Sequence, residues 1–163
     1  MVRVGILTCS DKGARGERPD TSAEAIKKLL PQELFQIERY AVVPDEQEAI
    51  TSKLVDWCDR DGLDLILTTG GTGLTPRDVA PESTRAVLER EIPGMAEAMR
   101  TASLAKTPHA MLSRGIAGVR RETLIINLPG SPRGARENLE VVLPALPHAL
   151  EKIKGSPREC GSE

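Results

Sequence analysis

A glycine-rich loop that follows a short apolar run carries the clearest chemical signal in this sequence. The run Leu63 to Thr69 leads directly into Gly70-Gly71-Thr72-Gly73, and Asp78 follows a few residues later. Glycines let backbone N–H groups converge on an anion, threonine hydroxyls add donors, and a carboxylate can hold the metal that accompanies phosphate. The pattern predicts a phosphate site at the end of a strand, with a tight turn that binds nothing as the alternative.

Two familiar nucleotide-binding patterns are absent from this loop. A Walker A loop needs lysine and then serine or threonine after its last glycine, whereas Leu74 and Thr75 stand here. The GxGxxG pattern of dinucleotide-binding proteins is also missing. The loop therefore disfavours both an ordinary P-loop nucleotidase and a NAD-binding protein.

Further polar residues follow the other predicted strands. Ser10 and Asp11 come after the first apolar run, Asp45 comes after the second, and the turn 127–131 ends the last one. In open α/β sheets the carboxyl ends of the strands line the ligand crevice, so these residues are expected to converge with Asp78. The turn 127–131 also begins a helix, whose free N–H groups attract anions.

Local alternatives remain for several of these residues. Asp45 with Glu48 makes a good helix N-cap, and Asp78 between two prolines suits an Asx turn or a cap. The turn 127–131 can equally be an ordinary helix entry. Ser113-Arg114 can contact a ligand or form part of a surface ion pair.

The elements that must position these residues alternate between strand and helix. Apolar runs predict strands over 2–8, 35–43 and 63–69, and helical spacing predicts helices over 21–30 and 45–58. Beyond the loop we expect helices over 81–90 and 93–105 and an edge pair of strands over 111–119 and 123–128. A final helix over 133–153 should be kinked or split by Pro144 and Pro147. This order predicts the α/β class with parallel pairing and right-handed crossovers.

Composition narrows the function classes. The 163 residues, 39% of them hydrophobic, suit one domain, predicted over 1–155 with a loose tail at 156–163. A net charge of −2, no basic block and 2% aromatic residues argue against a nucleic-acid partner. The apolar N-terminal run is too short to span a membrane and charges follow it at once, so we expect a cytoplasmic protein without a membrane partner. Three widely spaced cysteines predict neither a disulfide framework nor a zinc site.

Taken together, these motifs resemble the MogA/MoaB family of molybdopterin adenylyltransferases, which is related to the G domain of gephyrin. The matching segments run in family order across nearly the whole chain: 7–11, 43–46, 68–82, 93–97, 112–114 and 127–132. Ala80 departs from the pattern, because many adenylyltransferases have threonine there. The resemblance implies a three-layer α/β/α sandwich with a mostly parallel central sheet, assembled as a homotrimer.

The resemblance also implies a reaction and its site. The family transfers AMP from Mg-ATP to the terminal phosphate of molybdopterin and releases pyrophosphate. Asp45 and Asp78 match the family aspartates implicated in catalysis and in Mg²⁺ use. The residues that match the substrate-binding crevice are Ser10, Asp11, Gly70, Gly71, Thr72, Gly73, Ser113, Asn127, Pro129, Gly130 and Ser131.

The expected partners are molybdopterin and ATP as substrates, two further copies of the chain, and a downstream protein that inserts molybdate. Some MoaB-type relatives keep the glycine loop but do not catalyse adenylylation. A non-catalytic molybdopterin-binding or carrier protein is therefore the alternative. A nucleotide-binding regulator built on a flavodoxin-like sheet is a third hypothesis.

Overall fold

The computed structural model describes residues 1–157 and 160, and a six-stranded sheet forms its centre. The strand order is β2-β1-β3-β6-β5-β4. The neighbours from β2 through β6 pair in parallel, whereas β5 and β4 add antiparallel pairs at the far edge. The strands are β1 (Val2–Cys9), β2 (Phe35–Val43), β3 (Leu65–Thr69), β4 (Arg90–Glu91), β5 (Ala117–Arg120) and β6 (Thr123–Leu128).

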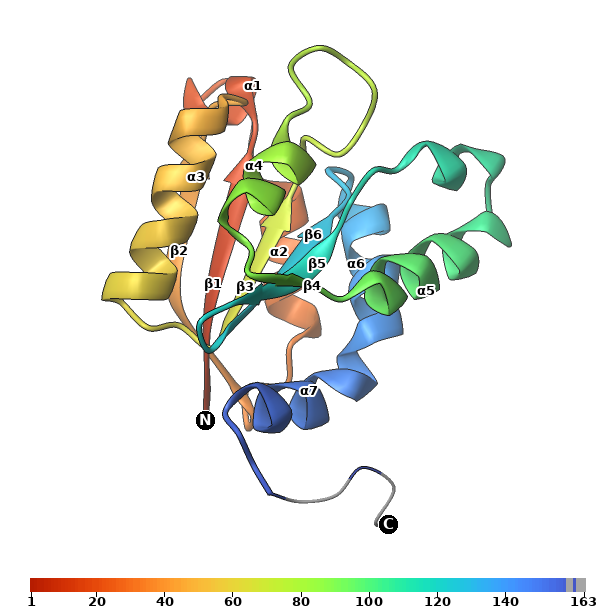
Figure 1. Ribbon diagram of the computed structural model, residues 1–163. Coiled ribbons are helices and arrows are strands. Elements are labelled where there is room, and N and C mark those ends of the chain that lie inside the picture. Colours follow the sequence, from red (N-terminus) through yellow and green to blue (C-terminus); the bar gives the residue numbers. More distant parts are fainter. Residues whose placement is uncertain (158–159, 161–163) are drawn as a thin grey trace.

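Helices cover both faces of this sheet (Figure 1). On one face lie α3 (Gln47–Val55), which continues into a π-helical turn (Asp56–Arg60), and α4 (Ala80–Val87). The other face is covered by α2 (Thr21–Leu29), α5 (Pro93–Leu104), α6 (Pro132–Val142) and α7 (Leu146–Ile153). The short α1 (Asp11–Ala14) follows β1 directly. The predicted three-layer α/β/α sandwich with a mostly parallel sheet is confirmed.

The central strand β3 shows how the sequence builds the two cores. All five of its residues are buried. Leu65 and Leu67 pack with the α2 and α6 side, whereas Ile66 between them packs with the α3 and α4 side. Side chains of a strand alternate between faces, so a continuous apolar run is what a sheet covered on both faces requires.

The antiparallel edge differs most from the sequence prediction. The predicted strand 111–119 instead begins with two residues of a 3-10 helix, η2 (Pro108–Leu112), continues through 113–116 without regular structure, and becomes β5 only at Ala117. Pro108 favours this turn, and the Thr107 side chain accepts a hydrogen bond from the His109 N–H to cap it. Met111 and Leu112 are exposed, so these apolar residues do not belong to a buried strand.

Other boundaries shift for local reasons. The helix predicted over 81–90 ends at Val87, because Arg90–Glu91 pairs with β5 as strand β4. Helix α2 is capped by Asp20, whose side chain accepts a hydrogen bond from the Ala23 N–H. The predicted split of the last helix is confirmed, since Leu143–Ala145 forms a 3-10 turn between α6 and α7. Of the predicted tail 156–163, residues 158–159 and 161–163 lie outside the described residues.

The strand order creates a switch point between β1 and β3. The chain leaves β1 toward α2 on one face and leaves β3 toward α4 on the other. Ligands bind in the crevice that such a divergence opens at the carboxyl ends of the strands. In Figure 1 this end lies at the top, whereas β1 begins and α7 ends at the bottom. No helix in the described part of the chain is long and apolar enough to cross a membrane.

We expect Gly5→Ala to destabilise the fold. A Cβ there would lie 2.7 Å from Leu63 Cδ1 and 2.8 Å from Trp57 Cε3, so the core between β1 and the π-helical turn would be overpacked. Such overpacking costs about 1–3 kcal/mol, measurable by urea denaturation. The matched control is Gly94→Ala in α5, where no heavy atom lies within 4 Å, and which should be neutral or slightly stabilising. Equal stability of the two variants would contradict this packing argument.

Candidate functional site

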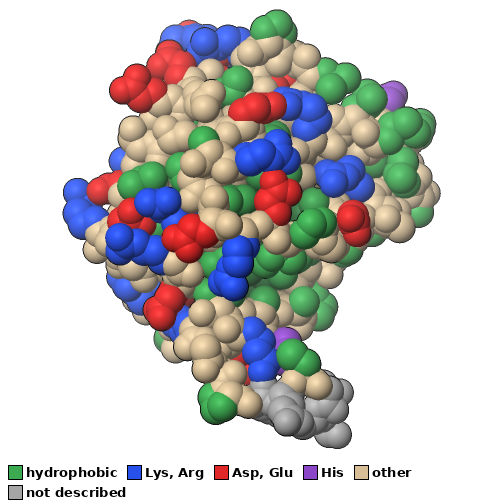
Figure 2. Space-filling model, viewed as in Figure 1, with side chains coloured by type: hydrophobic (Ala, Val, Ile, Leu, Met, Phe, Trp, Pro, Cys, Tyr) green, Lys and Arg blue, Asp and Glu red, His purple; other side chains and the backbone are tan. Residues whose placement is uncertain are grey.

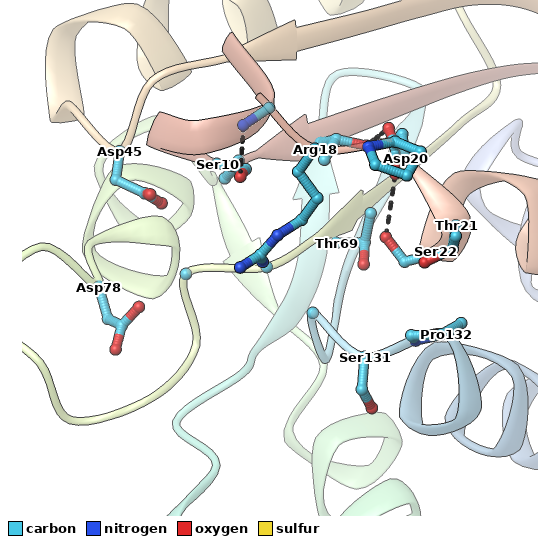
Figure 3. A pocket seen from close by; sticks show the side chains of 17 residues that line it. Ser10, Arg18, Asp20, Thr21, Ser22, Asp45, Thr69, Asp78, Ser131 and Pro132 are labelled. Atoms are coloured by element: carbon cyan, nitrogen blue, oxygen red, sulfur yellow. Dashed lines mark hydrogen bonds between the residues drawn. The ribbon is translucent and has the colours of Figure 1, made fainter. Parts of the chain in front are cut away.

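The carboxyl ends of β1, β2, β3 and β6 surround a cleft of about 560 Å³ (Figure 3). The loops that leave these strands bring together residues far apart in the sequence. The predicted site residues that line the cleft are Ser10, Asp45, Gly70, Gly71, Asp78, Gly130 and Ser131.

The floor of the cleft depends on glycines that allow strand ends to touch. Gly70 and Gly71 have φ values of +93° and +68°, which side-chain-bearing residues rarely adopt. A Cβ on Gly70 would lie 2.4 Å from the carbonyl oxygen of Cys9, and one on Gly130 would lie 3.2 Å from the Cα of Gly70. The Gly70 N–H also donates to the Leu128 carbonyl at 3.2 Å. Backbone therefore forms the surface where β1, β3 and β6 meet.

Asp45 and Asp11 hold the ends of β1 and β2 together. The Asp11 N–H donates to Asp45 Oδ2 at 3.0 Å, and the Asp45 N–H donates to Asp11 Oδ1 at 3.0 Å. The residue that precedes α3 is Glu46, and its side chain forms no capping hydrogen bond. The interpretation of Asp45 as a helix cap is therefore wrong, because its carboxylate turns toward the end of β1 instead.

The second carboxylate oxygen of Asp45 is the atom that most clearly indicates a bound ligand. Asp45 Oδ1 is buried and has no hydrogen-bond partner among the described residues. Burial raises the pKa of Asp45, and the nearby carboxylates of Asp11 and Asp78 raise it further. A buried, unpaired carboxylate oxygen is costly unless a cation or a proton compensates it. The chemistry of Asp45 therefore suits a bound cation.

Asp78 lies at the same end of the cleft, in the loop between β3 and α4 (Figure 3). Its Oδ2 accepts hydrogen bonds from the N–H and the hydroxyl of Thr75, at 2.9 and 2.8 Å. Neither an Asx turn nor a cap of α4 is found, since the bonded residue precedes Asp78 and α4 lacks a side-chain cap. A Cβ on Gly73 would lie 2.9 Å from Asp78 Oδ2, so that glycine makes the approach possible.

Two arginines fix the loop that carries Asp78. Arg114 donates to the carbonyl oxygens of Gly73 and Asp78 at 2.8 and 2.7 Å and forms an ion pair with Glu82. Arg77 binds the carboxylate of Asp11 through two hydrogen bonds of 3.0 and 2.9 Å. The Arg77 guanidinium thereby lowers the pKa of Asp11. The Asp11 carboxylate is thus engaged by Arg77 and by the Asp45 N–H, and Asp11 is not among the residues that line the cleft.

Asn127, a predicted substrate-binding residue, is part of the interior instead. Its side chain donates to the hydroxyls of Thr68 and Thr84, both at 2.9 Å, and accepts from the Ile116 N–H at 3.2 Å. Only 2% of its surface is exposed. Its amide is therefore occupied in joining β6 to β3, α4 and the start of β5, and it does not face the cleft.

The remaining predicted residues lie beside the cleft. Thr72 is buried, and its carbonyl and that of Gly73 both accept hydrogen bonds from Arg114. Ser113 and Pro129 line a second cavity of about 260 Å³, which shares Ser131 with the main cleft. The two adjoining spaces thus take up most of the predicted residues, whereas Asp11, Thr72, Gly73 and Asn127 line neither.

The loop between α1 and α2 also lines the cleft, although none of its residues is among the predicted site residues. Asp20 accepts hydrogen bonds from the Thr8 and Tyr40 hydroxyls at 2.5 and 2.6 Å, and from Ser22 and the Ala23 N–H at 3.1 Å each. Burial alone would raise the pKa of Asp20, but these donors lower it below its usual value. An aspartate directly before a helical pattern is an N-cap signal that identifies Asp20, whereas no motif singles out Arg18, which also lines the cleft.

The donor set fits a cation that arrives with phosphate. Within the described residues no group of three or more His, Cys, Asp or Glu side chains forms a cage for a metal ion. Mg²⁺ is typically held by one or two carboxylates together with substrate phosphates and water. Asp45 and Asp78 could supply those carboxylates, and the unpartnered Oδ1 of Asp45 is a free ligand atom.

The fold and the crevice at its switch point define an α/β protein that binds a small ligand above the strand ends. The chain belongs to the family described as probable molybdopterin binding domain, whose model matches residues 5–148.

Individual relatives agree with this assignment. The molybdopterin adenylyltransferase of Helicobacter pylori strain J99 is 43% identical over 157 residues, covering 95% of this chain and 89% of that protein. Gephyrin of Dictyostelium discoideum is 48% identical over 165 residues, covering 95% of this chain but 23% of that protein. The crystal structure of the molybdopterin biosynthesis enzyme MoaB from Thermus thermophilus is 61% identical with a TM-score of 0.91, covering 98% and 100% of the two chains.

We expect Asp45→Asn to stabilise the protein at neutral pH when no metal is present. The pKa of Asp45 is raised in the folded state, so ionising it disfavours folding once the pH exceeds the unfolded value of about 4. The variant should therefore melt at a higher temperature than the wild type at pH 7 in EDTA, and at the same temperature near pH 3. The exposed pair of Asp56 with Arg60 provides a control, since Asp56→Asn should give no such gain. A gain that persists unchanged at pH 3 would contradict the titration argument.

Proposed function

We propose that this protein is a molybdopterin adenylyltransferase, which transfers AMP from Mg-ATP to the terminal phosphate of molybdopterin. The observation that carries the proposal is the pair Asp45 and Asp78 on one cleft, above a floor of Gly70 and Gly71. Relatives that bear this name cover most of the chain. A carboxylate pair beside side-chain-free backbone is suited to phosphates that must come close together.

The chemistry explains why such a cleft is needed. A molybdopterin phosphate oxygen attacks the α-phosphorus of ATP, the new P–O bond forms, and the bond to the bridging oxygen breaks as pyrophosphate leaves. Two phosphate charges about 4 Å apart repel by about 4 kcal/mol at an effective dielectric constant near 20. Mg²⁺ held by Asp45 and Asp78 would neutralise part of that charge. The attacking phosphate is already anionic, so no general base is required of the protein.

Other residues of the cleft then act by positioning. The Gly70 N–H is bonded to the Leu128 carbonyl, so the backbone N–H groups that follow it in the loop are the ones that would donate to phosphate oxygens. Ser10, Gly130 and Ser131 line the same space, and Ser131 borders the second cavity that contains Ser113 and Pro129. Two adjoining cavities suit a reaction that joins two substrates.

The direct test is turnover. Purified protein incubated with molybdopterin and Mg-ATP should yield adenylylated molybdopterin and pyrophosphate in equal amounts. Binding of molybdopterin without either product would contradict the adenylyltransferase and favour the carrier protein.

We expect Asp78→Asn to reduce the rate of adenylylation at least about 100-fold. The substitution removes a negative charge that would hold Mg²⁺ at the reacting phosphates. The affinity for molybdopterin should stay within a factor of about 3, since the neutral amide keeps the shape of the side chain. Turnover measured by pyrophosphate release, with affinity measured by fluorescence, checks both parts. Asp56→Asn on the π-helical turn, remote from the cleft, is the control that should retain full turnover. Near-normal turnover by Asp78→Asn would exclude it as a metal-holding residue.

The assembly that we propose is a homotrimer in the cytoplasm, which passes its product to a protein that inserts molybdate. Exposed apolar side chains support an interface between copies. Leu104 of α5 and Met111 and Leu112 of η2 are each more than 40% exposed, and Figure 2 shows hydrophobic side chains gathered at that edge. Apolar groups clustered on a surface are typical of interaction sites.

Light scattering should therefore give three times the chain mass of 17.6 kDa. The double variant Met111→Glu with Leu112→Glu should dissociate the assembly, because charges would be buried in the interface. A wild-type protein that stays at 17.6 kDa at micromolar concentration would contradict the trimer.

A further inference from the structure

Arg18 brings an unneutralised positive charge to the cleft. It lies in the loop between α1 and α2, and no hydrogen bond or ion pair joins its side chain to any described residue. Its neighbour Arg15 is bound to Glu17 at 3.0 Å. Figure 3 shows the Arg18 side chain extended into the cleft, with Asp45 and Asp78 to one side and Ser131 to the other.

The charges around the cleft make this arrangement informative. Three carboxylates line the cleft, those of Asp20, Asp45 and Asp78. Arg18 is the one basic side chain among the described residues that line it. Asp20 is already satisfied by four donors. Although three carboxylates line the same cleft, Arg18 pairs with none of them. Its five N–H donors are therefore left for a ligand.

The backbone on both sides of Arg18 is held in place. Gly16, with φ +72°, makes the turn, and hydrogen bonds of 3.0 Å join it and Glu17 to α1. Pro19 follows Arg18 and restricts its backbone to extended conformations. Asp20 then anchors the loop to β1 and β2 through Thr8 and Tyr40. The backbone that carries the Arg18 side chain is thus fixed beside the cleft before any ligand binds.

The ligand that matches this group is a phosphate. A guanidinium presents a planar fork of donors that binds phosphate through two hydrogen bonds. The helices α2 and α6 also begin at the cleft, where Thr21 and Pro132 line it, so their N-terminal N–H groups add positive potential. A carboxylate-rich cleft that must accept several phosphates needs such compensation.

We propose that Arg18 is a phosphate-binding residue of this cleft. It binds phosphate oxygens of the substrates as they converge between the glycine floor and the carboxylate pair. The inference deepens the proposed function and rests on it for the identity of the phosphates. The phosphate bound by Arg18 belongs either to ATP or to molybdopterin, and binding measurements with each ligand distinguish the two.

The experiment compares Arg18→Ala and Arg18→Lys with the matched control Arg15→Ala in the same loop. Titration calorimetry would measure the binding of Mg-ATP, AMP, molybdopterin and inorganic pyrophosphate. Arg18→Ala should raise the dissociation constant of at least one phosphate ligand tenfold or more, a change of about 1.4 kcal/mol in binding free energy. A loss larger for Mg-ATP than for AMP assigns Arg18 to the polyphosphate, and a loss confined to molybdopterin assigns it to the attacking phosphate. Arg18→Lys should recover part of the loss, and Arg15→Ala should match the wild type.

The salt dependence gives a second readout. Because the guanidinium contributes by its charge, the affinity of Arg18→Ala for the phosphate ligand should fall less steeply with ionic strength than the affinity of the wild type. The melting temperature should not change, because the side chain has no partner in the described part of the fold. Dissociation constants for all four ligands that equal those of the wild type would overturn the inference.

Failure of the inference and failure of the proposed function remain distinguishable. If the wild type turns over and Arg18→Ala is unchanged in every constant, the adenylyltransferase stands and the role of Arg18 falls. If the wild type yields no product but binds pyrophosphate in a manner that depends on Arg18, the phosphate site stands and the proposed reaction falls.

Discussion

The close contact between Gly70 and the carbonyl group of Cys9 is the constraint on which the cleft depends. At that point a Cβ would lie 2.4 Å from the carbonyl oxygen, so neighbouring parallel strands can end side by side with only backbone between them. The positive φ of Gly70 and Gly71 then turns the chain away from β3 toward α4. Because β1 sends its chain toward the opposite face, the two loops diverge and leave the cleft open above the backbone floor.

The carboxylates around that floor are organised at a cost to the unliganded protein. Asp45 and Asp11 satisfy each other's backbone N–H groups, yet one oxygen of Asp45 stays buried without a partner in the described structure. Meanwhile Arg77 and Arg114 hold the neighbouring loop without pairing with the carboxylate of either Asp45 or Asp78. The arginines thus build the walls of the site, while Asp45 and Asp78 each keep one carboxylate oxygen without a hydrogen bond in the described structure. A buried polar atom left unpaired at a site is a common exchange of stability for binding.

Much of this fold could be predicted, because burial leaves a periodic trace in the sequence. The apolar run of β3, the glycines after it and the prolines that split α6 from α7 each act through neighbouring residues, so they are visible in one segment. The interpretation of Asp45 as a cap failed because its partner, Asp11, lies 34 residues away. Asn127 was assigned to the cleft because it ends a strand, yet three distant partners draw its side chain inward. No sequence motif surrounds Arg18, and its role can be inferred only from the cleft that its side chain enters.

The positions of the chain ends have a consequence for how the fold can be used in longer polypeptides. The start of β1 and the end of α7 lie at the end of the sheet opposite the cleft (Figure 1). A connection leaving from either place need not pass over the glycine floor. The fold can therefore serve as a module within a larger chain with its cleft open; in the Dictyostelium gephyrin the matching region accounts for 23% of the length. Fusion tags or tethers at these two places should likewise leave the cleft accessible.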